Sequence, residues 1–421
     1  MQRNIRYTML KYIQADFAVE KSINPLRIYE LNNNQIKDGI ILYLCEREIR
    51  VKDNFALNYA LQKSKELNLE LKIIHPQKKY SSKLKQEFIN KQLLQTKEQF
   101  LEIGIDINII EGNIHEYLNK LKIGLLIIDF NPILKREELK KLPVKIVEID
   151  GHNIIPARFI SDKQEYSAGT IRRKIFLNIE HFLTEFDNST YKKTEADYAL
   201  DDFIKNRLSD YAKYKNDFEK NVLSELSKYL NLGFLSSQRT AIEVIKSSVD
   251  DINKEVFLEE IIVRKELADN FCLFCEDFKS FSCVPNWARE SLNAHETDLR
   301  TYTYSLSELE NSQTHDRLWN AAQNQLKKEG VIHGYLRMYW AKKIAEWAQS
   351  PKQALDFAIY LNDKYAFDAP SPNGYTGILW SIGGLHDKPF RNWFITGKIR
   401  RMSYDSIKRK FDIEKYINFY S

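Results

Sequence analysis

Tryptophan is the residue type whose placement in this sequence could support redox chemistry. All six tryptophans lie in the second half of the chain, at Trp287, Trp319, Trp340, Trp347, Trp380 and Trp393. Trp340 and Trp347 are seven residues apart in a segment with a helical pattern, so both fall on one helix face, about 10 Å apart along the axis. Electrons can hop over such a gap. Spacing alone favours core packing, because aromatic side chains two turns apart commonly fill a hydrophobic core.

Carboxyl groups occur among apolar residues in the segment 257–272, at Glu259, Glu260 and Glu266. A carboxyl group that is forced into an apolar pocket favours its acid form and can donate a hydrogen bond to a carbonyl. For each glutamate alone, a solvent-facing side chain is the default interpretation. Glu260 and Arg264 also have the i,i+4 spacing of an ordinary helical ion pair, which would explain both without catalysis.

Arg337 lies in the same helical segment as Trp340 and is either a surface charge or a buried cation. Burying an unpaired arginine is costly, so a functional arginine in this aromatic setting needs a carboxylate partner. Asp363 and Asp368, in LNDKYAFDAPSPNGY, are the candidate partners, and the sequence alone leaves both open.

The four cysteines, Cys45, Cys272, Cys275 and Cys283, are too few and too poorly spaced for a disulfide framework. We therefore expect a reducing, intracellular setting. The pair Cys272 and Cys275 lacks a second ligand pair at metal-binding spacing, so neither zinc nor redox chemistry is expected there. Glycine-rich nucleotide-binding, hydrolase and kinase motifs are absent from the sequence.

Short β-branched runs alternate with amphipathic stretches between residues 39 and 150, which is the pattern of βαβ units. The expected strands are Ile40–Cys45, Leu69–His75, Ile105–Ile110, Ile123–Asp129 and Val144–Ile149, with a helix within Asp53–Leu67. This pattern predicts a parallel, doubly wound sheet with a ligand site at the carboxyl ends of its strands.

From about Thr194 onward the strand-like runs disappear and long helical patterns dominate. We predict four regions: an N-terminal tail at 1–30, an α/β domain at 31–155, an interdomain linker at 156–195 and an all-α domain at 196–421. No apolar run approaches the roughly 20 residues that cross a bilayer, so no membrane association is expected.

Charge is nearly balanced over the whole chain, with 63 Lys and Arg against 58 Asp and Glu. Residues 388–410 differ, because they hold eight basic residues and a single acidic one, Asp405. Such a basic stretch is the best local candidate for contact with nucleic-acid phosphates.

Three blocks of the sequence resemble class II cyclobutane pyrimidine dimer photolyases, a branch of the photolyase/cryptochrome family. They cover residues 43–60, residues 150–175 and nearly everything from 224 to 417, where FLEEIIVRKELADNFC, HGYLRMYWAKKI and PNGYTGILWSIGGLHD follow in the family's order. The resemblance implies an α/β antenna-type domain followed by a helical domain that binds FAD. Its implied activity is that of a carbon–carbon lyase, which repairs UV-damaged double-stranded DNA by light-driven electron transfer from reduced FAD to a flipped-out dimer.

The resemblance also implies roles for residues around the cofactor. Trp340, Trp319 and Trp347 would form an electron-transfer chain, in order of increasing distance from the flavin. Asn362 would lie beside the reactive flavin nitrogen, and Arg337 would pair with Asp368 near the ring system. The remaining contacts to FAD would come from Tyr211, Ser224, Leu226, Ser227 and Asp363.

Departures from the family's pattern occur among these contacts. Lys228 stands where a proline is usual, and Asn231 and Leu232 stand where the family often has His-Phe. These differences leave the detailed contacts to FAD open. An antenna chromophore such as a deazaflavin is a further possibility, since members of the family differ in this respect and no residue here settles it.

On the DNA side, Glu260 would hydrogen-bond the dimer, with Glu259 as the alternative if the alignment shifts by one residue. Met338 and Trp380 would line the lesion pocket, and Arg400 would fill the hole left in the duplex. A cryptochrome-like photoreceptor without repair activity is the competing interpretation, and these lesion contacts favour repair over it. We expect an intracellular monomer, cytoplasmic or associated with the nucleoid in a bacterium or archaeon.

Overall fold

Buried β-branched runs form the strands of the N-terminal half. The computed structural model describes residues 9–13, 16–186 and 191–421. Its six-stranded sheet has the order β1-β6-β5-β2-β3-β4 and comprises β1 Ile28–Glu30, β2 Ile40–Leu44, β3 Leu71–Pro76, β4 Ile107–Ile110, β5 Ile123–Asp129 and β6 Lys145–Ile149. Strands β2 to β6 are parallel, which confirms the α/β prediction to within two residues at the strand ends.

Strand β1 was not predicted, and it makes the sheet mixed rather than purely parallel. It pairs antiparallel with β6 through Ile28 and Ile149, within the segment predicted to be a peripheral tail. At three residues it is too short to show a period-two pattern, so sequence periodicity gives no signal for it.

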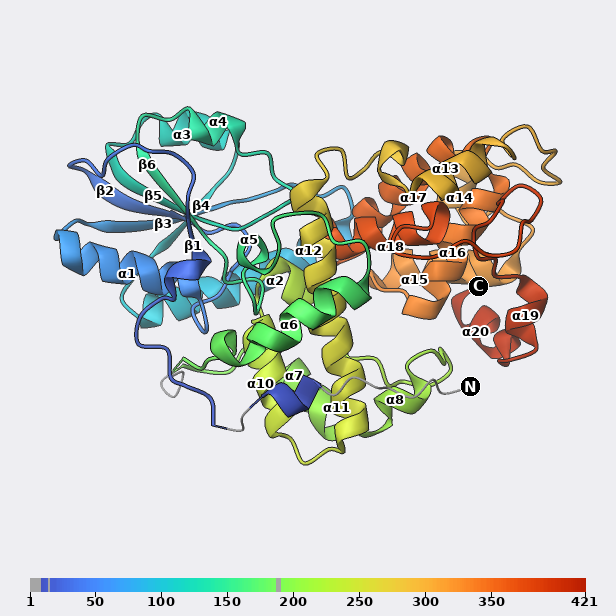
Figure 1. Ribbon diagram of the computed structural model, residues 1–421, viewed down its shortest axis with the longest axis horizontal. Coiled ribbons are helices and arrows are strands. Elements are labelled where there is room, and N and C mark those ends of the chain that lie inside the picture. The colour runs from blue at the N-terminus through green and yellow to red at the C-terminus, as the bar shows by residue number, and fades with distance from the viewer. Residues whose placement is uncertain (1–8, 14–15, 187–190) are drawn as a thin grey trace.

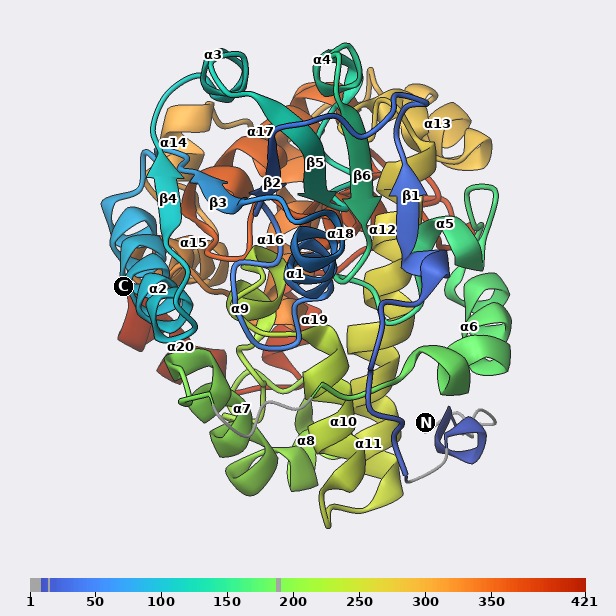
Figure 2. The same cartoon turned by 90° about the vertical axis from the view of Figure 1, so that its left-hand side faces the viewer.

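Helices cover both faces of the sheet, as a doubly wound fold requires (Figures 1 and 2). Helices α1 Phe55–Leu67 and α2 Lys83–Glu102 lie on one side, and α3 Ile114–Leu118 and α4 Glu137–Lys140 lie on the other. Tyr43 packs into the core beneath the first pair, whereas its neighbours Leu42 and Leu44 pack beneath the second. Successive side chains of one strand therefore serve two separate cores.

The rest of the chain is helical: in Figure 1 its earlier helices, such as α6, α7, α10 and α11, lie in the lower middle, and the later helices α13 to α18 lie at the end of the molecule opposite the sheet. Beyond residue 194 the sheet gains no further strand, and the described residues form only helices and one isolated bridge between Trp393 and Gly397. The helices are α5 Ala157–Ile160, α6 Ala168–Phe182, α7 Glu195–Asn206, α8 Tyr211–Tyr214, α9 Ser227–Leu232, α10 Ser237–Lys246, α11 Asp251–Leu258, α12 Lys265–Phe274, α13 Asn286–Asn293, α14 Leu306–Glu310, α15 Arg317–Glu329, α16 Gly334–Trp347, α17 Pro351–Tyr365, α18 Pro372–Gly383, α19 Tyr404–Lys408 and α20 Ile413–Tyr420.

Single-turn elements join these helices. Four are 3-10 turns, η1 Met9–Tyr12, η2 Pro25–Arg27, η3 Leu208–Asp210 and η5 Phe281–Cys283. The fifth, η4 Glu259–Arg264, is π-helical and connects α11 to α12 without a break. Such π-helical turns inside a longer helix are frequent at functional sites.

Polar contacts tie the N-terminal residues to both halves of the molecule. The backbone N–H groups of Met9 and Leu10 donate to the carboxylate of Glu255 in α11, at 2.9 and 2.8 Å. Arg27 is buried, and its guanidinium donates to the carbonyls of Asp150 and Phe182, among others. This part of the predicted tail is therefore built into the fold.

The cysteines correct one expectation from the sequence. Cys275 and Cys283 form a disulfide, although no disulfide was expected, whereas Cys45 and Cys272 are buried free thiols. The chain leaves α12 after Phe274 and turns back through η5, which brings two side chains together that helical spacing would keep apart. Within residues 9–13, 16–186 and 191–421, no helix combines the length and the apolar character needed to cross a membrane.

Candidate functional site

A cavity of about 220 Å³ opens between α8, α9, the π-helical turn η4 and the chain that enters α18. We call it the helical cavity. Five of the predicted site residues line it: Tyr211, Ser224, Ser227, Glu260 and Asp368. The structure thus gathers at one place residues that are up to 157 positions apart in the sequence, from Tyr211 to Asp368.

Asp368 is held at the cavity by a two-point ion pair with Arg337 of α16. The two guanidinium nitrogens lie 3.1 and 3.2 Å from the two carboxylate oxygens. Burial alone would raise the pKa of Asp368, but Arg337, a hydrogen bond from Ser227 and the nearby Lys85 together hold that pKa below its usual value. Of the two candidate partners of Arg337, the structure selects Asp368.

Asn231 in α9 supports the same corner of the cavity, although it was noted in the sequence only as a departure from the family's pattern. Its amide donates to the carbonyls of Asp368 and Pro370, at 3.0 and 3.1 Å. This contact fixes the chain between α17 and α18 where Asp368 leaves it. Because Asn231 differs from the residue that the family usually has at this position, its contacts could not be inferred from the resemblance.

The π-helical turn separates the two neighbouring glutamates. Glu259 lies outside the cavity lining and binds Arg172, with Oε2 3.0 Å from Nε, and Arg264, at 3.3 Å. Glu260 lines the cavity, and its Oε1 lies 2.6 Å from Nζ of Lys215. The predicted i,i+4 pair between Glu260 and Arg264 is therefore wrong, because the i,i+5 repeat of a π-helix brings Arg264 to Glu259 instead.

Burial distinguishes Glu266 from Glu260. Glu266 is buried, and its Oε1 accepts the backbone N–H groups of Ile154 and Ile155 at 2.7 and 3.2 Å. Burial raises the pKa of Glu266 to about 8, although Lys265 opposes the shift. The Glu260 side chain is 42% exposed, so the apolar environment that the sequence suggested belongs to Glu266.

Three tryptophans form a contiguous cluster in the helical part. The rings of Trp319 in α15 and Trp340 in α16 are stacked, with centroids 6.2 Å apart and an angle of 3° between them. Trp347 meets Trp319 edge to face at 5.5 Å. Trp319 therefore lies between the two tryptophans of α16 and divides the gap along that helix into two short steps.

Asn362 and Asp363 lie on α17, outside the cavity lining. Asn362 is buried and donates to Oδ1 of Asp363 at 3.3 Å, and Tyr375 of α18 donates to Oδ2 at 2.9 Å. Burial is the main cause that raises the pKa of Asp363. Lys85 of α2 donates to the Asp363 carbonyl at 2.9 Å, so the α/β domain contacts this end of α17 directly.

Trp380 of α18 and Arg400 lie next to each other, and neither lines the helical cavity. The Arg400 guanidinium carbon lies 5.8 Å from the Trp380 ring centroid and 4.2 Å from that of Phe390.

Two further predicted residues do not join the helical cavity: Leu226 is fully buried at the start of α9, and Met338 is half-buried on α16.

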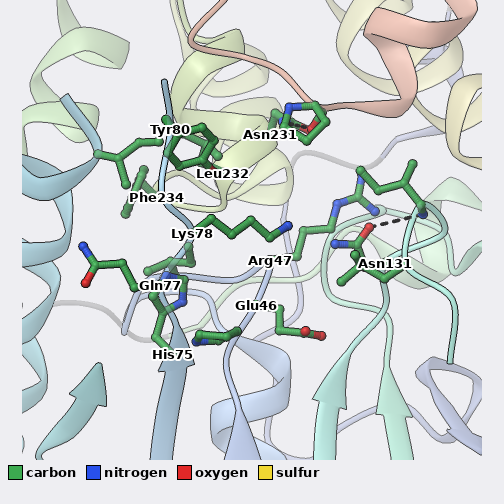
Figure 3. A pocket seen from close by; sticks show the side chains of 16 residues that line it. Glu46, Arg47, His75, Gln77, Lys78, Tyr80, Asn131, Asn231, Leu232 and Phe234 are labelled. Atoms are coloured by element: carbon green, nitrogen blue, oxygen red, sulfur yellow. Dashed lines mark hydrogen bonds between the residues drawn. The ribbon is translucent and has the colours of Figure 1, made fainter. Parts of the chain in front are cut away.

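A second cavity, of about 60 Å³, lies at the carboxyl ends of the parallel strands, and we call it the sheet crevice (Figure 3). His75 and Gln77 reach it from the end of β3, and Asn131 reaches it from the loop after β5. Glu46 and Arg47 come from the loop after β2. This is the position that the sheet topology predicts for a ligand.

Arg47 and Asn231 line both cavities and so form their shared wall. Arg47 is buried and pairs with Asp269 at 2.8 Å, whereas its Nη1 has no hydrogen-bond partner among the described residues. An unpaired guanidinium nitrogen at this depth suits an anionic or carbonyl-bearing ligand. Arg47 could not be predicted as a site residue, because a single arginine after a strand forms no recognisable pattern.

The helical cavity has the side chains that a flavin nucleotide requires. Cations and hydroxyl groups that suit phosphates lie on its wall, at Arg47, Arg264, Lys265, Ser224, Ser227 and Ser371. An apolar part suits a flat ring system and is formed by Tyr211, Leu230, Phe257 and Ile261. The residues present therefore fit FAD.

Comparison with curated proteins shows similarity over nearly the whole chain. A deoxyribodipyrimidine photo-lyase of Potorous tridactylus is 35% identical over an alignment of 471 positions, gaps included, which covers 99% of this chain and 88% of the relative. The enzymes of that name from Arabidopsis thaliana and Methanothermobacter thermautotrophicus are 34% and 30% identical, over 90% and 94% of this chain and 88% and 98% of their own lengths. No protein-family model matches the chain.

Solved structures share the fold at lower sequence identity. A class III photolyase from Agrobacterium tumefaciens superposes with a TM-score of 0.68 at 16% identity, over 92% of this chain and 87% of that one. A cryptochrome from Synechocystis also gives 0.68, at 12% identity, over 92% and 89%. The fold is that of the photolyase/cryptochrome proteins. The chain belongs to the deoxyribodipyrimidine photo-lyases and is an enzyme of that family.

Proposed function

We propose that this chain splits cyclobutane pyrimidine dimers in UV-damaged double-stranded DNA with light, as a class II photolyase. The observation that carries the proposal is the π-helical turn, which gives Glu260 to the helical cavity and holds Glu259 away from it. That arrangement supports the assignment of Glu260 rather than Glu259 as the carboxyl group that binds the dimer. The curated relatives named photo-lyase support the reaction class.

FAD is the cofactor that we propose for the helical cavity. Reduced FAD, when bound, supplies the electron that opens the dimer after light absorption. The contacts to FAD would come from α8, α9 and the loop between them, through Tyr211, Ser224 and Ser227. Leu226 is buried at the end of that loop and would hold it in place. Arg337 fixes the Asp368 carboxylate at the cavity. Asn362 and Asp363 lie on α17 outside the cavity lining, and we propose that they contact FAD from there.

The lesion would be bound by residues of four different segments: η4, α16, α18 and the chain between α18 and α19. Glu260 would accept or donate a hydrogen bond at the dimer once its contact with Lys215 opens. Met338 and Trp380 would form the apolar sides of the lesion pocket, and Arg400 would occupy the space left in the duplex. A dimer stacks and pairs poorly, so its extrusion costs less than that of a normal base.

Trp340, Trp319 and Trp347 would provide the route by which an electron crosses the helical domain. Stacked and edge-to-face contacts at 6.2 and 5.5 Å connect the three rings without an intervening residue. In that order, Trp340 would be nearest to the cofactor and Trp347 furthest from it.

The sheet crevice is our proposed site for a second chromophore, such as a deazaflavin. Its position at the carboxyl ends of the strands supports ligand binding there. Arg47 and Asn231 would then contact both ligands, because they form the wall between the two cavities.

The test is repair of a dimer-containing oligonucleotide by the purified, reduced protein, in blue light and in the dark. We expect light-dependent recovery of intact thymines that Glu260→Ala and Trp380→Ala both slow, whereas Glu259→Ala affects it less. Removing one preorganised hydrogen-bonding group of this kind costs about 100-fold in rate. Flavin binding without repair in light would instead favour a cryptochrome-like photoreceptor.

A further inference from the structure

Two cations flank Trp380, and one of them is buried. Lys342 of α16 places Nζ 4.8 Å from the Trp380 ring centroid, whereas the Arg400 guanidinium carbon lies at 5.8 Å. Nζ of Lys342 donates to the Ser381 carbonyl at 2.9 Å, which holds the ammonium group over the ring. The side chain is only 4% exposed, so water screens its charge weakly.

The ammonium group of Lys342 has no ion-pair partner among the described residues. Within the described part of the chain, no carboxylate oxygen lies within 4.0 Å of its Nζ. The charged groups around it are Glu346 on the same helix, Asp387 after α18, and Arg400. Arg300 and Arg401 line the small cavity that Lys342 also borders.

Trp319 and Trp340 have a different electrostatic setting, whereas the third tryptophan of the cluster, Trp347, has Nζ of Lys343 6.0 Å from its ring centroid, in an ion pair with Glu346. Among the described residues, no cation lies over the ring of Trp319 or Trp340. The buried carboxylate of Asp316 accepts the backbone N–H of Trp319 at 2.9 Å, and Gln323 accepts the indole N–H of Trp340 at 2.9 Å. A nearby carboxylate stabilises positive charge on an indole ring, whereas a cation over the ring face opposes it.

We propose that Lys342 is a positioning residue that prevents Trp380 from giving up an electron, so that only the cluster of Trp340, Trp319 and Trp347 acts as an electron donor. The proposal rests on the flavin and lesion assignments above. If Trp380 lost one electron to a photoexcited flavin, its ring would become positively charged 4.8 Å from the Lys342 ammonium group. Repulsion between the two charges disfavours that step and keeps the lesion pocket intact.

The first experiment needs no flavin. Full-length protein is exposed to tris(bipyridine)ruthenium(III), generated by a light flash with persulfate, and oxidised tryptophans are quantified by peptide mass spectrometry. The ruthenium complex takes one electron from Trp380 and returns to ruthenium(II); the indole then loses its N–H proton to water, and the radical combines with dioxygen. Trp393, which is 38% exposed, serves as the internal reference.

We expect Lys342→Met to raise the ratio of Trp380 to Trp393 oxidation about tenfold at pH 6, and Lys342→Arg to leave it unchanged. Burial lowers the pKa of Lys342 to about 7, and Arg400 adds to the shift. The wild-type ratio should therefore rise between pH 6 and pH 9 as the ammonium group loses its proton, whereas the ratio for Lys342→Met should stay flat. Equal ratios in the methionine and arginine variants would overturn the proposal.

A second experiment separates this proposal from the proposed function. In FAD-loaded protein carrying Trp340→Phe, the cluster is interrupted and the reduction of bound flavin by light should be slow. Adding Lys342→Met should restore part of the rate, and adding Trp380→Phe should remove it again. If the protein takes up no FAD, the ruthenium experiment still decides the role of Lys342. If FAD is reduced but Lys342→Met restores nothing, the proposal fails while the proposed function stands.

Discussion

The helical cavity is larger than the sheet crevice, about 220 against 60 Å³, and the two are built differently. The crevice follows from topology, since it lies where parallel strands end and any doubly wound sheet leaves an opening. The helical cavity depends on particular contacts: a π-helical turn, the pair of Arg337 with Asp368, and the amide of Asn231. The residues proposed to bind the cofactor and the lesion thus gather where the chain departs from regular structure.

The largest effect that this comparison predicts is in the helical part. Trp319→Phe removes the ring that lies between Trp340 and Trp347, so reduction of bound flavin by light should fall to the dark level. The measurement is the loss of oxidised-flavin absorbance under blue light with an external reductant. Trp393→Phe is the matched control, because Trp393 is half-exposed and lies outside the cluster. An unchanged rate in Trp319→Phe would show that the tryptophan cluster does not carry the electron to the flavin.

Breaking the ion pair at the helical cavity should cost stability. Arg337→Ala leaves the Asp368 carboxylate, whose side chain is 15% exposed, without its cation, and the free energy of unfolding should fall by about 1–3 kcal/mol. Urea unfolding followed by circular dichroism gives the value. Arg317→Ala is the control, since its pair with Glu414 is exposed and should contribute less than about 1 kcal/mol. Equal losses for the two variants would show that the ion pair at the cavity stabilises the fold no more than the exposed pair does.

The same pair predicts a pH dependence. The folded protein holds the pKa of Asp368 below its unfolded value of about 3.9, so the pair stabilises the fold above that pH. This contribution is lost as the pH falls through the lower, folded pKa. The difference in unfolding free energy between wild type and Asp368→Asn should therefore shrink below about pH 4. A constant difference from pH 7 to pH 3 would contradict the assigned shift.

The smallest effect is expected in the sheet crevice. Gln77→Ala shortens a half-buried side chain at the end of β3, and the free energy of unfolding should change by no more than about 0.5 kcal/mol. FAD affinity should also stay the same. If this variant weakened FAD binding, the proposal that FAD binds in the helical cavity and not in the sheet crevice would be wrong.

The sheet could be predicted from the sequence because its signal is local. Strands such as Ile123–Asp129 are buried along their whole length and read as continuous apolar runs. The three-residue strand β1 and the disulfide between Cys275 and Cys283 left no such signal, since both depend on segments that meet only in the folded chain.

The residues of the candidate site could be predicted mainly from the resemblance to a known family. Periodicity analysis assumes 3.6 residues per turn, so it could not show that Arg264 reaches Glu259 across a π-helical turn. Arg47 and Asn231 were missed for a related reason. Their importance comes from lying between two cavities, and no residue type or spacing encodes that position.

The most direct test of the account compares FAD binding after each cavity is filled with a large side chain. FAD is titrated into flavin-free wild type, Ser224→Trp in the helical cavity and Gln77→Trp in the sheet crevice, with flavin fluorescence as the signal. We predict that Ser224→Trp weakens binding by more than about tenfold and that Gln77→Trp leaves it unchanged. Weakened binding in Gln77→Trp together with normal binding in Ser224→Trp would contradict the assignment of the flavin to the helical cavity.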